Sequence, residues 1–259
     1  MAERAPFRLD GRVALITGGG SARGIGREVG AVLAAAGARV ALADLDGETA
    51  QANAASLDGD ALGLRMDVTS AESVAATVAD VRRRLGPVDI LVNSAGVTRS
   101  RPLWEIPLEE YDQLMAVNVR GGFVCMQAVV GDMRARGWGR LIWLSSVAGK
   151  QGGGVFGSTH YAASKAAVIG LCQGAARELG PNGITSNAIA PGLVMTGLVA
   201  GASSPQVEAD IAARVAASVP MRRVAEAADV AYAALYLASE EAAYVTGEVL
   251  DVNGGAYFD

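Results

Sequence analysis

Tyr161 and Lys165 stand four residues apart in the segment YAASK. On a helix that begins after Ser158 or Thr159, this spacing places the phenol and the ammonium group on one face. A nearby cation favours the phenolate and lowers the pKa of a tyrosine from its ordinary value of about 10. Such a tyrosine can pass a proton to or from an alcohol oxygen. Because the same pair also occurs on solvated helix faces, the other residues of the chain must decide its role.

Two serines, Ser145 and Ser146, follow the apolar run Leu141–Leu144, which predicts a buried strand. A serine hydroxyl at the end of a strand can donate a hydrogen bond to a substrate oxygen, although serines there are also frequent turn formers. His160 is the only histidine, so a Ser-His-Asp triad or a histidine-based zinc site would rest on it. His160 either faces the substrate or binds the loop where its helix begins.

The stretch TGGGSARGIG, Thr17–Gly26, follows the apolar run Val13–Ile16 and leads into an alanine-rich segment. Its register excludes the G-x-G-x-x-G fingerprint, and Ile25 stands where a phosphate P-loop requires lysine. What remains is a strand, Thr-Gly, a loop, Gly-Ile-Gly and a helix. Glycines let the backbone approach a pyrophosphate, and a helix that opens near Gly24 directs free N–H groups toward it. The predicted contacts of this turn are Gly18, Arg23, Gly24, Ile25 and Gly26.

Asp44 ends the second apolar run, Val40–Ala43, some twenty residues beyond the turn. A carboxylate there can accept hydrogen bonds from both ribose hydroxyls of an adenosine, and it repels a 2′-phosphate. NAD is therefore favoured over NADP. Arg23 argues the other way, since its guanidinium can pair with a phosphate, whereas Leu45 adds no positive charge.

Short apolar runs alternate with stretches whose apolar residues lie three and four apart, such as Ile25–Ala36, Val74–Leu85, Tyr111–Met133 and Tyr161–Leu179. Strands buried on both faces and joined by helices predict an α/β fold, a doubly wound parallel sheet of about seven strands with helices on both faces. With no linker in the sequence, we expect one domain over residues 1–259. Ligands of such a sheet bind at the carboxyl ends of its strands. A helix over Pro205–Ser218, inside an insertion of residues 193–219, is either a mobile lid at that edge or a rigid excursion used for packing.

The formal charge of −5 and the pI near 5.1 argue against a nucleic-acid or anionic-membrane surface. The partner is expected to be a small molecule. The first ten residues lack the apolar core of a signal peptide, and no run of about 18 apolar residues follows, so we expect a cytoplasmic protein without a membrane segment. Cys125 and Cys172 lie far apart in apolar helical patterns, which predicts buried thiols and no metal site.

Further motifs follow the remaining strands in chain order. Asp67-Val68 follows the third, Asn93-Ser94-Ala95-Gly96 follows the fourth, and Asn118 lies in the next helix. Pro191-Gly192-Leu193-Val194-Met195-Thr196 and Val252-Asn253-Gly254-Gly255 complete the series. With the glycine turn, Ser146 and Tyr161-x-x-x-Lys165, these motifs resemble the short-chain dehydrogenase/reductase superfamily over essentially the whole chain.

This resemblance implies roles for individual residues. Tyr161 is the general acid/base, Ser146 orients the substrate oxygen, and Lys165 binds the nicotinamide ribose and lowers the tyrosine pKa. Asn118 holds a water of a proton relay. The remaining implied cofactor contacts are Asp67, Val68, Asn93, Ala95, Gly96, Pro191, Gly192, Val194 and Thr196. The resemblance also implies a homotetramer in which the Tyr111–Met133 and Tyr161–Leu179 helices pair across subunits.

Three departures from the family pattern stand out. The glycine turn and the interval from Ser146 to Tyr161 are each about two residues longer than usual, and Ser94 replaces the commoner asparagine. The function expected is an NAD(H)-dependent oxidoreductase acting on a secondary alcohol or ketone. Two alternatives stay open: an NADPH-dependent 3-oxoacyl-thioester reductase, which Arg23 would suit, and a non-catalytic dinucleotide-binding sensor.

Overall fold

A computed structural model of the chain describes residues 5–153, 158–196 and 205–258. Seven strands form one sheet in the order β3-β2-β1-β4-β5-β6-β7, and every neighbouring pair is parallel. The strands are β1 (Val13–Thr17), β2 (Arg39–Asp44), β3 (Ala61–Arg65), β4 (Ile90–Asn93), β5 (Gly139–Leu144), β6 (Ile184–Pro191) and β7 (Val249–Val252). The predicted doubly wound sheet in a single domain is confirmed.

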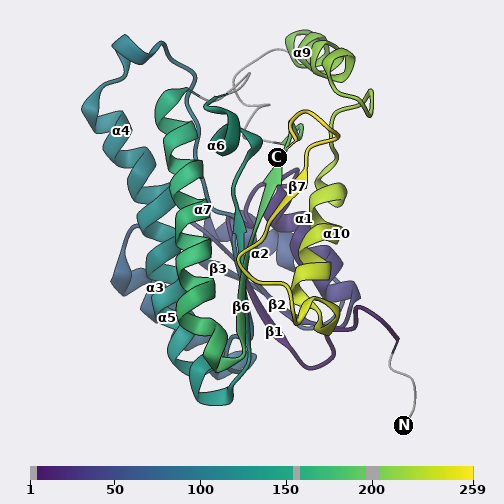
Figure 1. Cartoon of the computed structure of the whole chain (residues 1–259). Coiled ribbons are helices and arrows are strands. Elements are labelled where there is room, and N and C mark those ends of the chain that lie inside the picture. Colours follow the sequence, from purple (N-terminus) through teal and green to yellow (C-terminus); the bar gives the residue numbers. More distant parts are fainter. Residues whose placement is uncertain (1–4, 154–157, 197–204, 259) are drawn as a thin grey trace.

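Helices cover both faces of the sheet (Figure 1). One layer holds α1 (Ile25–Ala35), α2 (Gly47–Ala54) and α10 (Ala227–Ala238). The other holds α3 (Ala71–Arg84), α4 (Leu108–Met115), α5 (Gly122–Arg136) and α7 (Thr159–Leu179). The short helices are η1 (Leu103–Glu105), the π-helix η2 (Ala116–Gly121), α6 (Val147–Gln151), η3 (Gly180–Asn182) and η4 (Glu240–Ala242).

The two layers bury alternate residues of the same strands. On β1, Ala14 and Ile16 face the α1 and α10 layer, whereas Val13 and Leu15 face the α3 and α5 layer. All are at most 1% exposed, which explains why the strand reads as a continuous apolar run. Helices α2, α6 and α10 were not among the stretches read from the sequence. Of these, α2 (GETAQANA) is mostly small and polar, and α10 (AADVAYAALYLA) is apolar nearly all round, so neither has a clear amphipathic period.

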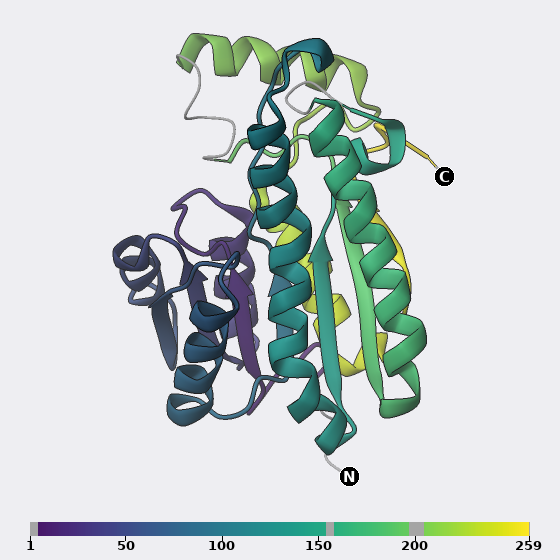
Figure 2. The same ribbon diagram turned by 90° about the vertical axis from the view of Figure 1, so that its left-hand side faces the viewer.

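The helix predicted over Pro205–Ser218 is α9, with the bounds expected. Figure 2 shows it lying across the carboxyl end of the sheet. Ser204, the predicted cap of this helix, and residues 197–204 of the insertion lie outside the described residues. Whether the insertion moves as a lid stays a prediction.

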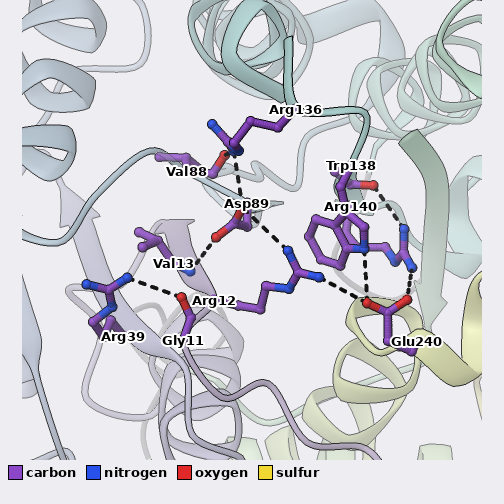
Figure 3. A network of polar contacts seen from close by, with 11 residues as sticks. Gly11, Arg12, Val13, Arg39, Val88, Asp89, Arg136, Trp138, Arg140 and Glu240 are labelled. Carbon is purple, nitrogen blue, oxygen red and sulfur yellow. Dashed lines mark hydrogen bonds and ion pairs between the residues drawn. The ribbon is translucent and has the colours of Figure 1, made fainter. Parts of the chain in front are cut away.

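A network of charged side chains lies at the other end of the sheet, where the strands begin (Figure 3). Arg140 on β5 is 2% exposed, donates through Nε to the Ser239 carbonyl at 3.3 Å and lies 3.4 Å from the Glu240 carboxylate. Glu240 also accepts from Arg12 and from the Trp138 indole, each at 3.0 Å. The guanidinium carbons of Arg12 and Arg140 lie 3.5 and 4.4 Å from the centre of the Trp138 ring. Because this network lies at the amino ends of the strands, it stabilises the fold away from the ligand edge.

One helical stretch of the described residues, Leu108–Arg136, is long and apolar enough to cross a membrane by length and composition. Its most apolar window has a mean hydropathy of 1.4 and is 28% buried inside the chain. Core helices of globular proteins meet the same criteria, and here the stretch packs beside α3 and α7 on one face of the sheet. It is therefore weak evidence for a membrane segment.

Candidate active site

A cavity of about 570 Å³ opens at the carboxyl end of the sheet. It lies where the turns after β1, β4 and β5 meet, at the reversal of strand order expected to hold the ligand. Of the residues predicted from the sequence, its lining includes Gly18, Gly24, Ile25, Gly26, Asp44, Asp67, Val68, Ala95, Gly96, Tyr161, Lys165, Pro191 and Thr196. Side chains far apart in the sequence thus meet around one cavity.

Two glycines of the turn pack so closely against the backbone that a side chain would not fit there. Gly18 has a φ of +73°, and a Cβ built there would lie 2.9 Å from the backbone nitrogen of Ala95. A Cβ on Gly26 would lie 2.5 Å from the Gly18 carbonyl oxygen, so α1 begins directly against the turn. Gly24 is the N-cap of α1, and no side chain of the described residues caps that helix end. The open N–H groups and the shallow backbone surface suit a phosphate.

The Thr17 hydroxyl joins this turn to the next one along the edge. Its oxygen accepts hydrogen bonds from the backbone N–H groups of Ser94, at 3.1 Å, and Ala95, at 2.9 Å. The end of β1 and the end of β4 are thereby fixed to each other. Thr17 belongs to the turn motif, but its bonds to Ser94 and Ala95 depend on the pairing of β1 with β4, which the motif does not indicate.

Two carboxylates border the β2 and β3 side of the cavity. Asp44 accepts hydrogen bonds from the Gly20 N–H at 2.8 Å and the Asp46 N–H at 3.2 Å. Asp67 accepts from the N–H of Thr69 at 2.9 Å and from its hydroxyl at 2.7 Å, and these bonds lower the pKa of Asp67. Each carboxylate keeps lone pairs for a further donor.

Tyr161 and Lys165 lie on the same face of α7, as predicted. Lys165 is 6% exposed, its Nζ donates to the Leu144 carbonyl at 2.7 Å, and it lies 5.7 Å from the centre of the Tyr161 ring. Burial lowers the pKa of Lys165 to about 8. Burial also raises the pKa of Tyr161, and a hydrogen bond with Ser146 only partly offsets that.

The expected lowering of the tyrosine pKa by Lys165 is therefore corrected by the structure. The ammonium group is held by the Leu144 carbonyl, 5.7 Å from the centre of the ring, and the ring itself is partly buried. Desolvation disfavours the phenolate, and the hydrogen bond with Ser146 offsets this effect only in part.

Ser146 is the N-cap of α6, where its hydroxyl oxygen accepts from the Ala148 N–H at 3.1 Å. This bond fixes the hydroxyl at the end of β5, within reach of the phenol of Tyr161. Helix α6 in turn packs closely on α7, because a Cβ on Gly149 would lie 2.7 Å from the Lys165 carbonyl carbon. The two hydroxyls and the lysine are thus positioned by one helix pair.

Asn118 lies in the π-helical turn between α4 and α5, a distortion that frequently marks a functional site. Its side-chain oxygen accepts from the Val97 N–H at 2.8 Å. Its amide nitrogen donates to the Val97 carbonyl and to the Ser164 hydroxyl, each at 3.0 Å. The side chain holds the loop after β4 against α7, and both of its N–H groups are occupied.

Comparisons with known proteins match this chain along nearly its whole length. A family model described as enoyl-(acyl carrier protein) reductase matches residues 20–257. The 3-oxoacyl-[acyl-carrier-protein] reductase FabG of Escherichia coli is 40% identical over 251 residues, 97% of this chain and 99% of that protein. The sorbitol dehydrogenase of Cereibacter sphaeroides is 42% identical over 256 residues, 96% of this chain and 98% of that protein. A crystal structure of a short-chain type dehydrogenase/reductase from Mycobacterium marinum covers 98% of both chains at a TM-score of 0.90 and 34% identity.

The chain belongs to the short-chain dehydrogenase/reductase family. Members of this family are oxidoreductases that use a nicotinamide cofactor, and the residues around the cavity fit such a group. Gly18, Gly24 and Gly26 line the cavity with backbone for a pyrophosphate. The Asp44 and Asp67 carboxylates border the same cavity and could accept hydrogen bonds from the hydroxyls of an adenosine. No group of three or more His, Cys, Asp or Glu side chains in the described chain is arranged to hold a metal ion.

Four residues predicted to contact the cofactor do not line the cavity, three of them assigned by the family resemblance and one, Arg23, from the glycine turn. Asn93, the last residue of β4, is 8% exposed, and its side chain lies near Gly122 of α5. Gly192 borders a separate cavity of about 270 Å³, and Val194 forms an isolated bridge with Ala225. The side chain of Arg23 is 63% exposed, and its Nη2 lies 3.9 Å from Glu208 Oε2 on α9. Their contact with a dinucleotide stays a prediction.

His160 does not face the cavity of this short-chain dehydrogenase/reductase. It is 2% exposed, with Nε2 3.2 Å from Glu110 Oε1 on α4. Glu110 also accepts a hydrogen bond from Arg101 at 3.3 Å. His160 thus lies against α4, whereas the sequence offered a position facing the substrate or a bond to the loop where its helix begins. Of the tryptophans, Trp143 is buried and Trp104 is 84% exposed.

Several lining residues were not assigned to the cofactor from the sequence. They are Ser21, Ala43, Leu45, Met66, Ser94, Val97, Gln113, Val117, Leu144 and Ser145. Four of them, Leu45, Met66, Ser94 and Ser145, directly follow a strand, so the rule that ligands bind at the carboxyl ends of strands was the available signal for these. Gln113 and Val117 come from the α4 and π-helical segments, and only the tertiary packing brings them there.

Proposed function

We propose that the protein is an NAD(H)-dependent oxidoreductase that transfers hydride between nicotinamide and a secondary alcohol or ketone. The observation that carries the cofactor preference is Asp44, which lines the cavity at the end of β2 next to the half-exposed Leu45. A carboxylate there accepts ribose hydroxyls and repels a 2′-phosphate. Arg23, the residue that argued for NADP, lies beside Glu208 instead of the cavity.

The chemistry assigned to this chain's residues is proton transfer and orientation. When bound, nicotinamide supplies the hydride chemistry. Tyr161 removes the hydroxyl proton in the oxidative direction and returns it in the reductive direction. Ser146 holds the substrate oxygen beside that phenol, and Lys165 supplies positive charge from the same helix face. Asn118 supports this arrangement by fixing the loop after β4, and we propose that a relay water lies near it.

The decisive experiment replaces Tyr161 by phenylalanine. The variant is expected to bind NADH with a Kd near that of the wild type, because the ring and its packing remain. Turnover of the best alcohol in a panel of secondary alcohols is expected to fall by about three orders of magnitude, since the acid/base is lost. Near-normal turnover would refute the assignment of Tyr161, and a complete lack of NAD⁺ reduction by the wild type would favour a dinucleotide-binding sensor.

A second candidate is an NADPH-dependent 3-oxoacyl-thioester reductase. It is favoured by the 40% identity to a protein named 3-oxoacyl-[acyl-carrier-protein] reductase. The description of the matching family model, enoyl-(acyl carrier protein) reductase, shares with this candidate only an acyl-thioester substrate. The 42% identity to a sorbitol dehydrogenase supports an alcohol substrate instead. Comparing kcat/KM for NADH and NADPH, with a ketone and with a 3-oxoacyl thioester, separates the two. Asp44 predicts the higher value with NADH.

We further propose a cytoplasmic homotetramer. Support comes from the Leu108–Arg136 helix, most of whose apolar window is not buried within one chain, and from its side chains Tyr111 and Phe123, each 39% exposed. An apolar helix face of this kind is suited to pair with a second copy.

A further inference from the structure

The glycine turn has a buried part and an exposed part. Gly19 and Gly20 are buried, whereas Ser21, Ala22 and Arg23 are exposed. The buried part of the turn therefore lies toward β2 and α2, before the turn passes back to the start of α1.

Asn53 of α2 holds this buried part of the turn. Its side-chain nitrogen donates to the Gly19 carbonyl at 2.8 Å and to the Gly20 carbonyl at 2.9 Å. One amide thus uses both of its hydrogens on consecutive peptide groups. The turn is tied to a helix that neither begins nor ends it.

The opposite side of the same peptide contacts Asp44. The Gly20 N–H donates to Asp44 Oδ2 at 2.8 Å. A Cβ on Gly20 would lie 2.7 Å from the Asp44 carboxyl carbon and 2.8 Å from the Thr49 hydroxyl. The φ of Gly20 is not positive, so glycine is needed there for space alone. Asn53, Gly20 and Asp44 form a continuous chain of contacts from α2 to the cavity.

We propose that Asn53 is a positioning residue for cofactor specificity, which acts by holding Gly20 against the carboxylate of Asp44. This inference rests on the proposed function, in which Asp44 discriminates a free ribose from a 2′-phosphorylated one. The bond from Gly20 fixes the direction of the carboxylate and leaves its remaining lone pairs for ribose hydroxyls. A longer turn without the tether would let Asp44 rotate away from a 2′-phosphate, and the discrimination would weaken.

The test measures the Kd of NADH and of NADPH by fluorescence titration for the wild type, Asn53→Ala and Asp44→Ala. The matched control is Gln51→Ala, an exposed side chain on the same helix. Loss of two hydrogen bonds in Asn53→Ala is expected to raise the NADH Kd by about tenfold and to change the NADPH Kd less. The ratio of the NADPH Kd to the NADH Kd is therefore expected to fall. Gln51→Ala is expected to leave both unchanged.

The combined variant Asp44→Ala/Asn53→Ala shows whether Asn53 acts through Asp44. If it does, adding Asn53→Ala to Asp44→Ala changes the ratio no further, because the carboxylate is already gone. An unchanged ratio in Asn53→Ala, or an equal change with and without Asp44, overturns the inference. If Asp44→Ala itself leaves the ratio unchanged, the proposed NAD preference fails as well, so the two failures are distinguishable.

Gly20→Ala tests the same contact from the other side, should Asn53→Ala fold poorly. Its added methyl must displace the Asp44 carboxylate, so the ratio is again expected to fall, and an unchanged ratio overturns the inference. Hydrogen exchange in the protein without dinucleotide gives a reading independent of binding. The amides of Gly20 and Ser21 are expected to exchange faster in Asn53→Ala than in Gln51→Ala, and equal rates contradict the tether.

Discussion

At the scale of single residues, Lys165 combines burial with a hydrogen bond to the Leu144 carbonyl. Burial of its side chain lowers the pKa of Lys165 to about 8. The positive charge that Lys165 places near the Tyr161 phenol is therefore largely present at neutral pH and is lost as the pH rises above about 8.

This ionisation predicts the pH dependence of carbonyl reduction. We expect kcat/KM for NADH to be constant below about pH 8 and to fall as the pH rises through that value, because Lys165 loses its proton while Tyr161, whose pKa is raised, keeps its own. Initial rates between pH 6 and pH 9.5 measure this, since kcat/KM reports the free enzyme.

Lys165→Met serves as the control for this profile. The variant keeps a chain of similar length without a charge, so its residual activity is expected to show no step near pH 8. A wild-type profile that stays flat to pH 9.5 would contradict the assignment of the step to Lys165.

At the scale of elements, the charged network at the amino ends of the strands contrasts with the site at their carboxyl ends (Figure 3). Arg140 is buried, and burial lowers the pKa of its guanidinium, whereas Glu240 opposes that change. The network joins the start of β5 to the segment after α10 through Ser239 and Glu240.

Arg140→Ala is expected to lower the free energy of unfolding by about 3 kcal/mol, since it removes the guanidinium stem from the core and leaves the Ser239 carbonyl without this donor. Urea denaturation measures the change, and Arg134→Ala on the exposed end of α5 is the matched control. Activity per folded molecule is expected to stay unchanged, because the network lies away from the cavity. A loss of turnover without a change in the free energy of unfolding would show that the network around Arg140 affects catalysis at the cavity.

At the scale of the whole molecule, the exposed face of Leu108–Arg136 predicts the assembly. Light scattering is expected to give four times the 26.3 kDa mass of one chain. Phe123→Glu places a charge on the proposed contact and is expected to yield smaller species, whereas Gln51→Glu on α2 should leave the mass unchanged. A monomer at micromolar concentration in the wild type would contradict the tetramer.

The alternation of apolar runs and helical stretches was enough to predict a parallel sheet between two helical layers, because a strand covered on both faces must be apolar at every position. Most of the candidate site was predictable for a related reason. Asp44, Ser146 and the glycine turn all follow strands, and parallel strands bring their carboxyl ends to one edge. The π-helical turn around Asn118 has no sequence signature of its own, and it was missed.

The sequence by itself determined which side chains carry chemistry and which edge of the sheet they share, since residue type and strand direction are local properties. Only the tertiary structure decided their electrostatics and their partners. Burial between α6 and α7 sets the pKa of Lys165 and raises that of Tyr161, against the expectation from charge alone. Asn53 meets the glycine turn, Arg23 lies near Glu208, and His160 lies near Glu110, through contacts between elements distant in the chain. Desolvation and long-range contact depend on how the helices pack, and no spacing along the sequence encodes them.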